Sequence, residues 1–535
     1  MMLPTLISIL FLGGLVAWCA GRINPLLPRW VALITLLVDG VYFIDHCLAA
    51  GVLATSVATG LPGGEIWFFN YAREWIPQFG IQLLFAADCL SLVLNLLTIL
   101  LGIIAVMSAW NEIKERSGFF YFNLLWTLAG VVGIFSARDL FLFFFFWEVM
   151  LIPMYFIISL WGHENRVYAA LKFFIFTQLS GLLMLLSIVA LVFFHHAQTG
   201  IYTFDSLALR NTEFPQGVGL WVMLGFFVAF TVKLPSVPFH TWLPDAHTQA
   251  PTAGSVILAG LLLKTGAYGL IRFILPLFPE AAASFAPIAM SLGVISILYA
   301  AKLAFAQHDL KRLIAYTSVS HMGFILLGVF SANVLALQGA VLQMLAHGIS
   351  SAALFALAGS LQHRLHTRDI RNMGGLSQVV PRTAAVGMFF AIAALGMPGL
   401  GNFVGETLVL FGSFQANRTL TILAALGLIL APVYALKIIQ SAFHGEPSAY
   451  LQQHKSIPDF SRPETIAMAI MVIAIVWLGI QPQPVIRLVE PALTALLQPV
   501  EPSILQTSVD QVSSFDYKSS LESPSQLEQQ TLPGR

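Results

Sequence analysis

Charged residues are scarce in this sequence of 535 residues. Only 10% are Asp, Glu, Lys or Arg, whereas soluble globular domains carry about 25%. An ordinary water-exposed surface is therefore excluded, and a mean hydropathy of +0.82 agrees. Neither sign is in excess, because 26 Lys and Arg balance 26 Asp and Glu. A nucleic-acid-binding protein would need a basic excess, so that class is excluded as well.

Cysteine is rarer still, and the usual cofactor motifs are missing. The three cysteines, Cys19, Cys47 and Cys89, form no CxxC pair, so an iron–sulfur cluster, a zinc site or a disulfide framework is not expected. The sequence has no P-loop and no GxGxxG pattern that opens a βαβ unit, which argues against the common nucleotide-binding folds. We therefore expect this chain to hold no redox cofactor, nucleotide or metal of its own.

Long apolar runs fill the sequence from Leu3 almost to Leu497. A bilayer core about 30 Å thick needs roughly 20 apolar residues per helix, so the pattern predicts an all-α, polytopic membrane protein with about 14 transmembrane helices. The N-terminus lacks the positive region of a signal peptide, so the first run is interpreted as a retained span. Prolines 482 and 484 are expected to break the last span. The predicted spans cover residues 3–20, 30–52, 83–109, 118–137, 139–161, 168–194, 218–234, 253–275, 284–305, 312–331, 334–361, 384–415, 420–444 and 465–497.

Lys and Arg residues gather in alternate loops. Positively charged loops stay in the cytoplasm, and the even number of spans then places both termini in the periplasm of a bacterial inner membrane. The other loops hold little beyond Arg73, Arg138, Arg210 and Arg418. The richer set holds Arg22, Arg29, Lys114, Arg116, Arg166, Lys311, Arg312, Arg364, Arg368, Arg371, Arg382, Lys455 and Arg462.

A few ionisable residues fall inside the apolar spans, where a charge costs about 2.5–3.5 kcal/mol on insertion scales. A lone Lys near a helix end is more often a snorkelling side chain or half of a structural ion pair. Glu148 and Lys264 lie near the middle of their spans, where snorkelling is difficult, so a transport role is favoured for them. The whole set comprises Glu148, Lys233, Lys264, His321, His347, Glu406 and Lys437.

Proline breaks two of these spans beside a charge. Lys233 is followed by the prolines of LPSVP, and Glu406 follows Met397-Pro398-Gly399. Non-helical backbone at membrane depth is tolerated only where it is buried in protein or lines a wet cavity. A charge next to such a break therefore indicates an ion path.

The spacing of the charged residues indicates an internal repeat. Glu148 precedes Lys233 by 85 residues, as His321 precedes Glu406, and Lys437 follows Glu406 by 31 residues, as Lys264 follows Lys233. One offset of 173 residues therefore relates three pairs of titratable groups, and it relates the two proline-broken spans. The offset covers five spans, and an odd number inverts the topology. We predict two inverted five-helix repeats with broken helices.

Four stretches are long enough to identify a family. They are KLPSVPFHTWLPDAHTQAPTAGS from Lys233, LLLKTGAYG around Lys264, HDLKRLIAYTSVSHMGF around His321 and GMPGLGNFVGE ending at Glu406. They resemble the antiporter-like membrane subunits of respiratory complex I, the NADH-quinone oxidoreductase, and the likeness runs from about residue 111 to 484. The chain departs from the family pattern with Cys89 after Asp88 and with Ile257 in place of Asp.

The resemblance implies a domain organisation and a set of partners. We expect helices 1–3 in residues 1–110, the first repeat in 111–280, the second in 281–445, the last helix in 446–500 and a polar, disordered tail in 501–535. The partners would be other membrane and peripheral complex I subunits, especially neighbouring antiporter-like chains, within the lipid bilayer. NADH, FMN, iron–sulfur clusters and quinone would be held by those partner subunits.

The resemblance also implies roles in moving protons from cytoplasm to periplasm. Lys233 would be the central carrier, Glu148 its ion-pair partner, Lys264 a relay and Glu406 the exit group. His321 and His347 would bridge through water, since imidazole titrates near neutrality. Supporting roles are expected for Asp139, His240 and Lys437.

Some readings stay open at this point. His240 and His247 lie seven residues apart, a weak spacing for a metal pair, and a helix N-terminal charge explains Asp139 equally well. The chain could belong to a multi-subunit cation/proton antiporter or to a membrane-bound hydrogenase, which share the charged axis. A scaffold that merely holds neighbouring chains is disfavoured by the aligned buried charges.

Overall fold

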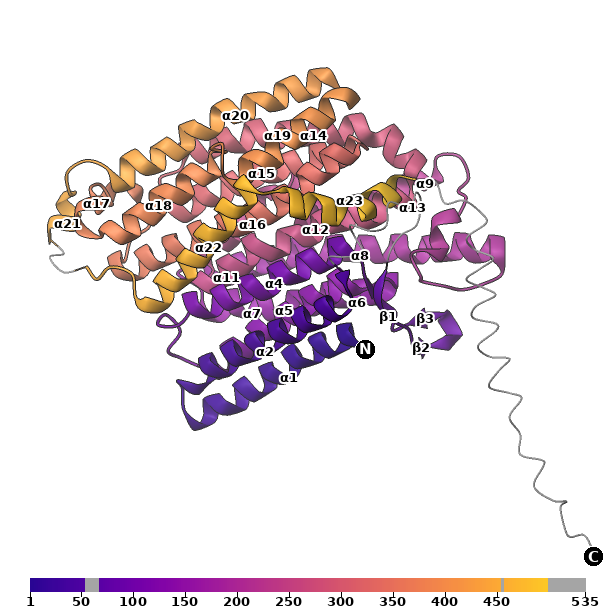
Figure 1. Ribbon diagram of the computed structural model, residues 1–535, viewed down its shortest axis with the longest axis horizontal. Coiled ribbons are helices and arrows are strands. Elements are labelled where there is room, and N and C mark those ends of the chain that lie inside the picture. Colours follow the sequence, from indigo (N-terminus) through magenta and orange to yellow (C-terminus); the bar gives the residue numbers. More distant parts are fainter. Residues whose placement is uncertain (53–66, 454–456, 499–535) are drawn as a thin grey trace, which may run out of the picture. The chain divides into compact units, whose positions relative to one another are not determined.

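The computed structural model describes residues 1–52, 67–453 and 457–498. Within them the chain is a bundle of long helices, and the predicted all-α class is confirmed (Figure 1). The N-terminal half contains α1 (Met2–Ile23), α2 (Leu27–Ala49), α4 (Cys89–Ser108), α5 (Ser117–Ser136), α6 (Leu140–Val149), α7 (Leu151–Trp161), α8 (Arg166–Thr199), α9 (Val218–Lys233), α10 (Trp242–Gln249), α11 (Thr252–Ile257), α12 (Leu263–Gly269) and α13 (Leu275–Leu277).

The second half of the bundle begins at Pro279. It contains α14 (Pro279–Ala306), α15 (Leu310–Phe330), α16 (Val334–Leu365), α17 (Leu376–Val379), α18 (Pro381–Ala394), α19 (Gly401–Ala416), α20 (Arg418–Ile438), α21 (Ala449–Gln453), α22 (Arg462–Ile480) and α23 (Gln483–Leu497). Short 3-10 helices span Pro77–Phe79, Ala208–Asn211, Phe239–Thr241 and Ile370–Asn372, and π-helical turns span Leu258–Leu262, Leu270–Ile274 and Ile439–Phe443.

Four short strands precede α4; three lie in the loop predicted between spans 30–52 and 83–109, and β4 lies at the start of the predicted span 83–109. The strands β1 (Phe68–Tyr71) and β4 (Phe85–Ala87) pair antiparallel, as do β2 (Glu74–Ile76) and β3 (Ile81–Gln82). They lie at one end of the bundle, and α17 and α21 lie at the other (Figure 1). Residues 53–66 of that predicted loop and the predicted polar tail lie outside the described residues.

Twelve helical segments in the described part are long and apolar enough to cross a membrane. Two shorter apolar helices, α9 and α18, belong to the spans that the sequence predicted to be broken. A multi-span membrane protein is thereby confirmed, although the predicted number of about 14 spans is not established by length and composition alone.

The breaks predicted at proline are present, and one further break was not predicted. Helix α9 ends at Lys233, α18 and α19 flank Pro398, and α22 and α23 flank Pro482. The span of residues 139–161 is also divided, at Met150 between α6 and α7. The first break follows Lys233 while the second precedes Glu406, so the offset of 173 aligns the charged residues and not the breaks themselves.

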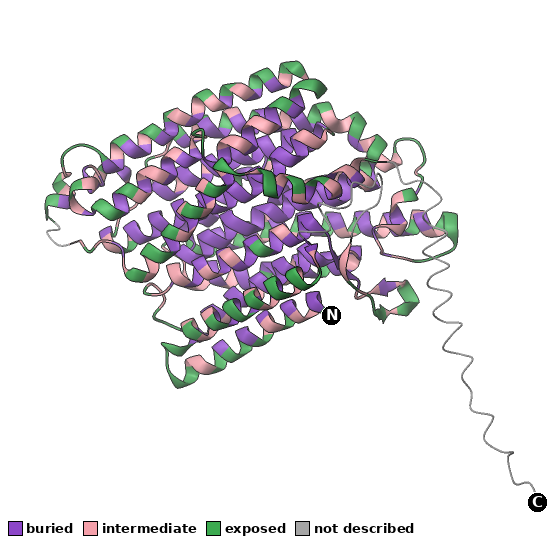
Figure 2. Cartoon of the chain, in the orientation of Figure 1, coloured by how far each residue is buried: buried purple, intermediate pink, exposed green. Residues whose placement is uncertain are grey.

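Burial is deepest along the middle of the bundle (Figure 2). The segment Thr252–Leu277 and helix α16 are fully buried, and α15 is almost so. By contrast, α1, α2, α14, α20 and α22 expose many large apolar side chains, as expected for helices that face lipid or a neighbouring chain. Lys233, Lys264 and Glu406 are therefore shielded by a layer of other helices, whereas Glu148 and Lys437 are only partly buried.

Two aspartates cap helices in matching ways at the starts of α6 and α15. Asp139 accepts hydrogen bonds from the N–H groups of Phe141 and Leu142, and Asp309 accepts one from Arg312. Each also forms an isolated antiparallel bridge with a later aspartate, Asp139 with residue 205 and Asp309 with residue 369. These equivalent connections support the predicted internal repeat.

A glycine sets the distance between α9 and α12. A Cβ atom on Gly266 would lie 2.5 Å from the carbonyl oxygen of Phe230 and 2.8 Å from the N–H of Leu234. Both are backbone atoms and cannot move aside cheaply. The two helices that carry Lys233 and Lys264 can therefore pack this closely only when residue 266 is glycine.

We predict that Gly266→Ala destabilises the protein by about 1–3 kcal/mol through overpacking. The matched control is Gly374→Ala, where the nearest atoms to the added Cβ would be at an ordinary 3.7 Å. The thermal unfolding midpoint of the purified protein checks this. Equal midpoints for the two variants would contradict the account of the α9–α12 contact.

Candidate functional site

Lys264 is fully buried and points at a histidine of another helix. Its Nζ lies 2.7 Å from Nδ1 of His347 on α16 and donates to the carbonyl oxygen of Ala259 at 2.5 Å. The acceptor Ala259 belongs to a π-helical turn that directly precedes α12. Such irregular turns occur frequently at functional sites, and here one supplies a carbonyl partner for a charge at membrane depth.

Glu406 on α19 belongs to a second buried cluster. Its Oε1 lies 2.8 Å from Nδ1 of His321 on α15, and Gln343 of α16 donates to the same oxygen at 3.0 Å. The hydroxyl of Tyr434 lies 3.4 Å from the other ring nitrogen of His321. Side chains of two other helices, α15 and α16, thus contact one carboxylate oxygen directly, and Tyr434 of α20 contacts the histidine behind it. Such partners lower the cost of burying a carboxylate.

The two clusters adjoin through their histidines. The ring centroids of His321 and His347 are 5.4 Å apart. Together with the direct contacts this gives a continuous buried series, Lys264–His347–His321–Glu406. The structure thus brings together four of the six residues that were predicted from the sequence to carry protons.

Lys233 and Glu148 form the other part of the nominated set. Lys233 is 1% exposed at the end of α9, and its Nζ lies 5.0 Å from the ring centroid of Trp147 and 5.6 Å from that of Phe173. The Glu148 carboxylate is close enough to interact with it electrostatically. Lys233 Nζ has no hydrogen-bond partner among the described residues, so the two groups do not form the direct ion pair that was expected.

Space for the Glu148 carboxylate is provided by α8. A Cβ atom on Gly181 would lie only 2.7 Å from Glu148 Oε1. In this arrangement the Trp147 ring contacts the ammonium group of Lys233, a cation–π contact that partly replaces the lost hydration of a buried charge. Glu148 and Lys233 therefore interact through space rather than through a hydrogen bond.

The three residues expected to be supporting lie away from this series. Asp139 caps α6, and its carboxylate accepts hydrogen bonds from three backbone N–H groups, including that of Gln82. His240 packs edge-on against Tyr299. Lys437 on α20 donates to the carbonyl oxygens of residues 305 and 307 at the end of α14. Its ammonium group therefore caps the C-terminus of α14, where a positive charge is favourable.

Two buried basic residues next to the series were not nominated by the sequence reasoning. His247 was considered only for a metal pair, yet its ring is fully buried, stacks 4.1 Å from Phe355 and interacts electrostatically with Lys264. Lys311 was assigned to a cytoplasmic loop, and that assignment is wrong. The residue is fully buried and donates to the carbonyl oxygen of Ala250, a contact between distant segments that local sequence does not reveal.

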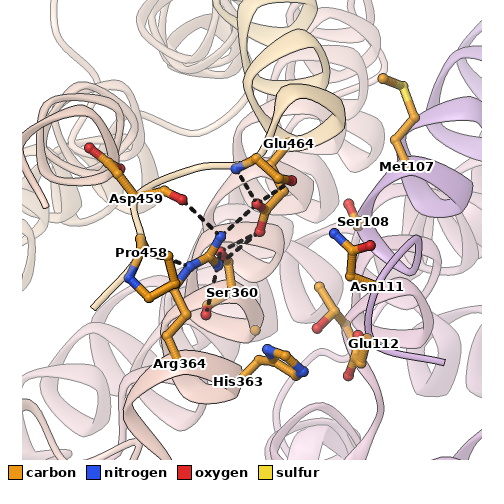
Figure 3. A pocket seen from close by; sticks show the side chains of 13 residues that line it. Met107, Ser108, Asn111, Glu112, Ser360, His363, Arg364, Pro458, Asp459 and Glu464 are labelled. Atoms are coloured by element: carbon orange, nitrogen blue, oxygen red, sulfur yellow. Dashed lines mark hydrogen bonds and ion pairs between the residues drawn. The ribbon is translucent and has the colours of Figure 1, made fainter. Parts of the chain in front are cut away.

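A cavity of about 380 Å³ opens at the end of the bundle where α4 and α16 end (Figure 3). Arg364 bridges to Glu464 at 2.6 Å on one side, and Glu112 and His363 lie on the other. The Glu112 carboxylate accepts a hydrogen bond from the N–H of Thr252, the first residue of α11. The cavity therefore reaches the start of the span that carries Lys264.

A second cavity of about 800 Å³ shares Glu112 and His363 with the first. Its lining includes His163, whose pKa is lowered to about 4 by burial and by the nearby positive charges of Lys311 and Arg368. This ring is thus neutral at physiological pH. Within the described ranges no group of three or more His, Cys, Asp or Glu side chains is placed to hold a metal ion.

The chain is similar in sequence and in fold to known proteins. Residues 137–431 match the family model described as "NADH:quinone oxidoreductase/Mrp antiporter, TM". The NADH-quinone oxidoreductase subunit M of Escherichia coli K12 is 52% identical over 91% of this chain and 96% of its own length, and that of Pseudomonas aeruginosa is 52% identical over 91% and 95%. A chain of respiratory complex I from Thermus thermophilus superposes with a TM-score of 0.80 at 29% identity, covering 93% of this chain and all of that one.

We predict that Gln343→Leu destabilises the protein by about 1–3 kcal/mol, because the buried Glu406 carboxylate loses a donor. Gln415→Leu is the matched control, since Gln415 is exposed on α19 and is linked only to Asn333 by a contact of 3.3 Å among those described. Thermal unfolding of the two purified variants distinguishes them. Unfolding of Gln343→Leu at the same temperature as the control would contradict a stabilising hydrogen bond between Gln343 and Glu406.

Proposed function

Because the chain belongs to the antiporter-like membrane subunits of NADH-quinone oxidoreductase, with the M-type subunits as its relatives, we propose that it moves protons across the membrane along a buried axis. The observation that carries this proposal is the series Lys264–His347–His321–Glu406, with contacts of 2.7 and 2.8 Å on either side of the histidine pair. Ionisable groups in the membrane are costly and mark proton relays.

Each group in the series has a part that suits its chemistry. Lys264 passes a proton to His347, a water molecule between the rings passes it to His321, and Glu406 receives it. A neutral imidazole can accept a proton on one nitrogen while it donates from the other. Excess positive charge therefore crosses the centre of the bundle without any side chain having to travel far.

Lys233 and Glu148 control the supply to this series. A nearby carboxylate favours the charged form of a lysine, whereas burial disfavours it. A small displacement of Glu148 toward or away from Lys233 would thus switch Lys233 between holding and releasing a proton. The close packing at Gly266 keeps Lys233 next to the helix that carries Lys264.

The energy comes from partner subunits. The relatives named NADH-quinone oxidoreductase subunit M are parts of a redox complex, and NADH, FMN, iron–sulfur clusters and quinone are assigned to its other subunits. Identity of 52% to these subunits over 91% of the chain favours complex I over a cation/proton antiporter or a hydrogenase.

The charged loops set the orientation of the chain in the membrane. We assign both termini to the periplasm of the bacterial inner membrane and the cavities around Glu112 to the cytoplasmic side. The organisation is three N-terminal helices in residues 1–110, repeats in 111–280 and 281–445, and a final helical region in 446–500. The matching caps of Asp139 and Asp309 support the two-repeat organisation.

Two lysines that the repeat spacing relates to each other provide a test of the axis. Lys264→Met should abolish proton pumping by the assembled complex, because His347 loses its buried donor. Lys437→Met should retain pumping and lose only about 0.3–1 kcal/mol of helix-end stabilisation. Quenching of a pH-sensitive dye by NADH-energised membranes measures both, with complex content checked in the same membranes.

Retained pumping in Lys264→Met, at normal complex content, would remove Lys264 from the path. Loss of pumping in Lys437→Met would show that Lys437 does more than cap the C-terminus of α14.

Replacement of Glu148 by Gln tests the supply step. The amide keeps the shape and removes the charge, so Lys233 loses its electrostatic partner and pumping should fall strongly while the complex still assembles. Glu115→Gln, at an exposed position outside the spans, is the control and should pump normally. Full pumping in Glu148→Gln would contradict the proposed control of Lys233.

A further inference from the structure

Lys264 lies on the same span as two further buried polar side chains, which form a second polar column. Lys264, Tyr268 and Arg272 are spaced four residues apart on one buried span, so they lie on one face of it. Their exposed fractions are 0%, 2% and 3%. The column runs toward the end of the bundle that carries the strands and the start of α4, the periplasmic end in the orientation proposed above.

Hydroxyl groups make up the first part of this column. The Tyr268 hydroxyl lies 3.2 Å from the Ser91 hydroxyl on α4 and donates to the carbonyl oxygen of Phe135 at 3.4 Å. On the same helix α4, Asn95 donates to the Ser136 hydroxyl at 3.3 Å. Hydroxyl groups both donate and accept, so this stretch is able to pass protons outward from Lys264.

An ion pair between Arg272 and Asp88 ends the column. The side chains are 3% and 5% exposed, and Asp88 also caps α4 by accepting the N–H of Ser91 at 2.9 Å. The guanidinium group of Arg272 lies 4.9 Å from the ring centroid of Trp67, and that of Arg138 lies 6.0 Å from the same ring. Arg138 in turn binds the half-exposed Asp205 through two contacts of 2.8 and 3.0 Å.

An arginine at this point interrupts a proton wire. A guanidinium group has no acceptor atom and is not deprotonated in proteins, so it cannot relay a proton. Its fixed positive charge also repels one, as in other pores that exclude protons. Protonation of Asp88 would remove a negative partner from the buried charge of Arg272, which is unfavourable.

We propose that the Arg272–Asp88 ion pair is a seal that closes a direct outlet from Lys264 through Tyr268 and Ser91. Protons on Lys264 must then continue to His347 and Glu406. The inference rests on the proposed function of Lys264 as a proton carrier. The seal gives transport its direction, since an open outlet would let protons return from the periplasm to the middle of the axis.

The seal is tested by passive proton leak in the complete complex. Arg272→Gln complex is reconstituted into liposomes, a pH step is imposed without NADH while valinomycin and potassium clamp the potential, and decay of the internal pH is followed with a dye. We expect a several-fold faster decay than for the wild type. Arg418→Gln, a change of another arginine at the same end of the bundle, should remain as tight as the wild type.

Two further variants separate the seal from a purely structural role. Adding Tyr268→Phe to Arg272→Gln removes the hydroxyl step and should restore the wild-type decay rate. If Arg272→Gln does not assemble, Asp88→Asn keeps the side-chain shape, breaks the ion pair and should leak in the same assay.

The seal is wrong if Arg272→Gln liposomes, or those of Asp88→Asn in its place, hold the pH step as well as the wild type. It is equally wrong if the leak persists after Tyr268→Phe is added, because protons would then be taking another route. The assay does not use NADH, so these results do not depend on energised pumping. Failure of the axis itself would appear in the Lys264→Met pumping measurement instead.

Discussion

The cost of a charge inside the hydrocarbon layer shapes this protein more than any other interaction. Moving an unpaired ion into a low-dielectric medium is prohibitive, so each buried ionisable group needs a partner. Lys264 has the Ala259 carbonyl and His347, Glu406 has Gln343 and His321, and Arg272 has Asp88. Every one of these partners comes from a different helix or from an irregular helical turn. The packing of the central helices and the pairing of the buried polar groups therefore depend on each other.

Irregular backbone is the means by which the fold meets this constraint. The π-helical turn before α12 supplies a carbonyl for Lys264, the end of α9 places Lys233 against aromatic rings, and the break before α19 precedes Glu406. A regular helix uses its own carbonyls internally, so it offers few partners to a buried charge. Gly266 and Gly181 complete the arrangement by admitting a backbone and a carboxylate where a methyl group would collide.

Much of this site was predictable from the sequence, because isolated charges in apolar runs are easy to see and expensive to keep. Glu148, Lys264 and Glu406 were nominated on that ground, and proline marked the breaks beside Lys233 and Glu406. Partners that are neutral or aromatic gave no such signal, so Gln343, Tyr434 and Trp147 were missed. Lys311 was placed in a loop because a charge near the end of a span usually lies in a loop. In the structure Lys311 is buried and donates to the carbonyl oxygen of the distant residue 250. The break at Met150 lies one turn before Pro153, which lacks a backbone donor and clashes with the carbonyl of residue 149, a signal that was overlooked because Pro153 itself lies within α7.

Whether protons pass along the series from Lys264 to Glu406 is best tested by the ratio of protons moved to NADH oxidised in the His347→Leu complex. His347 is the only residue of the series that contacts Lys264 on one side and adjoins His321 on the other in the described structure. Leucine fills a similar volume and carries no proton. The account predicts that this ratio falls well below the wild-type value in complexes that assemble and bind NADH normally. A wild-type ratio at a wild-type rate of NADH oxidation would contradict it.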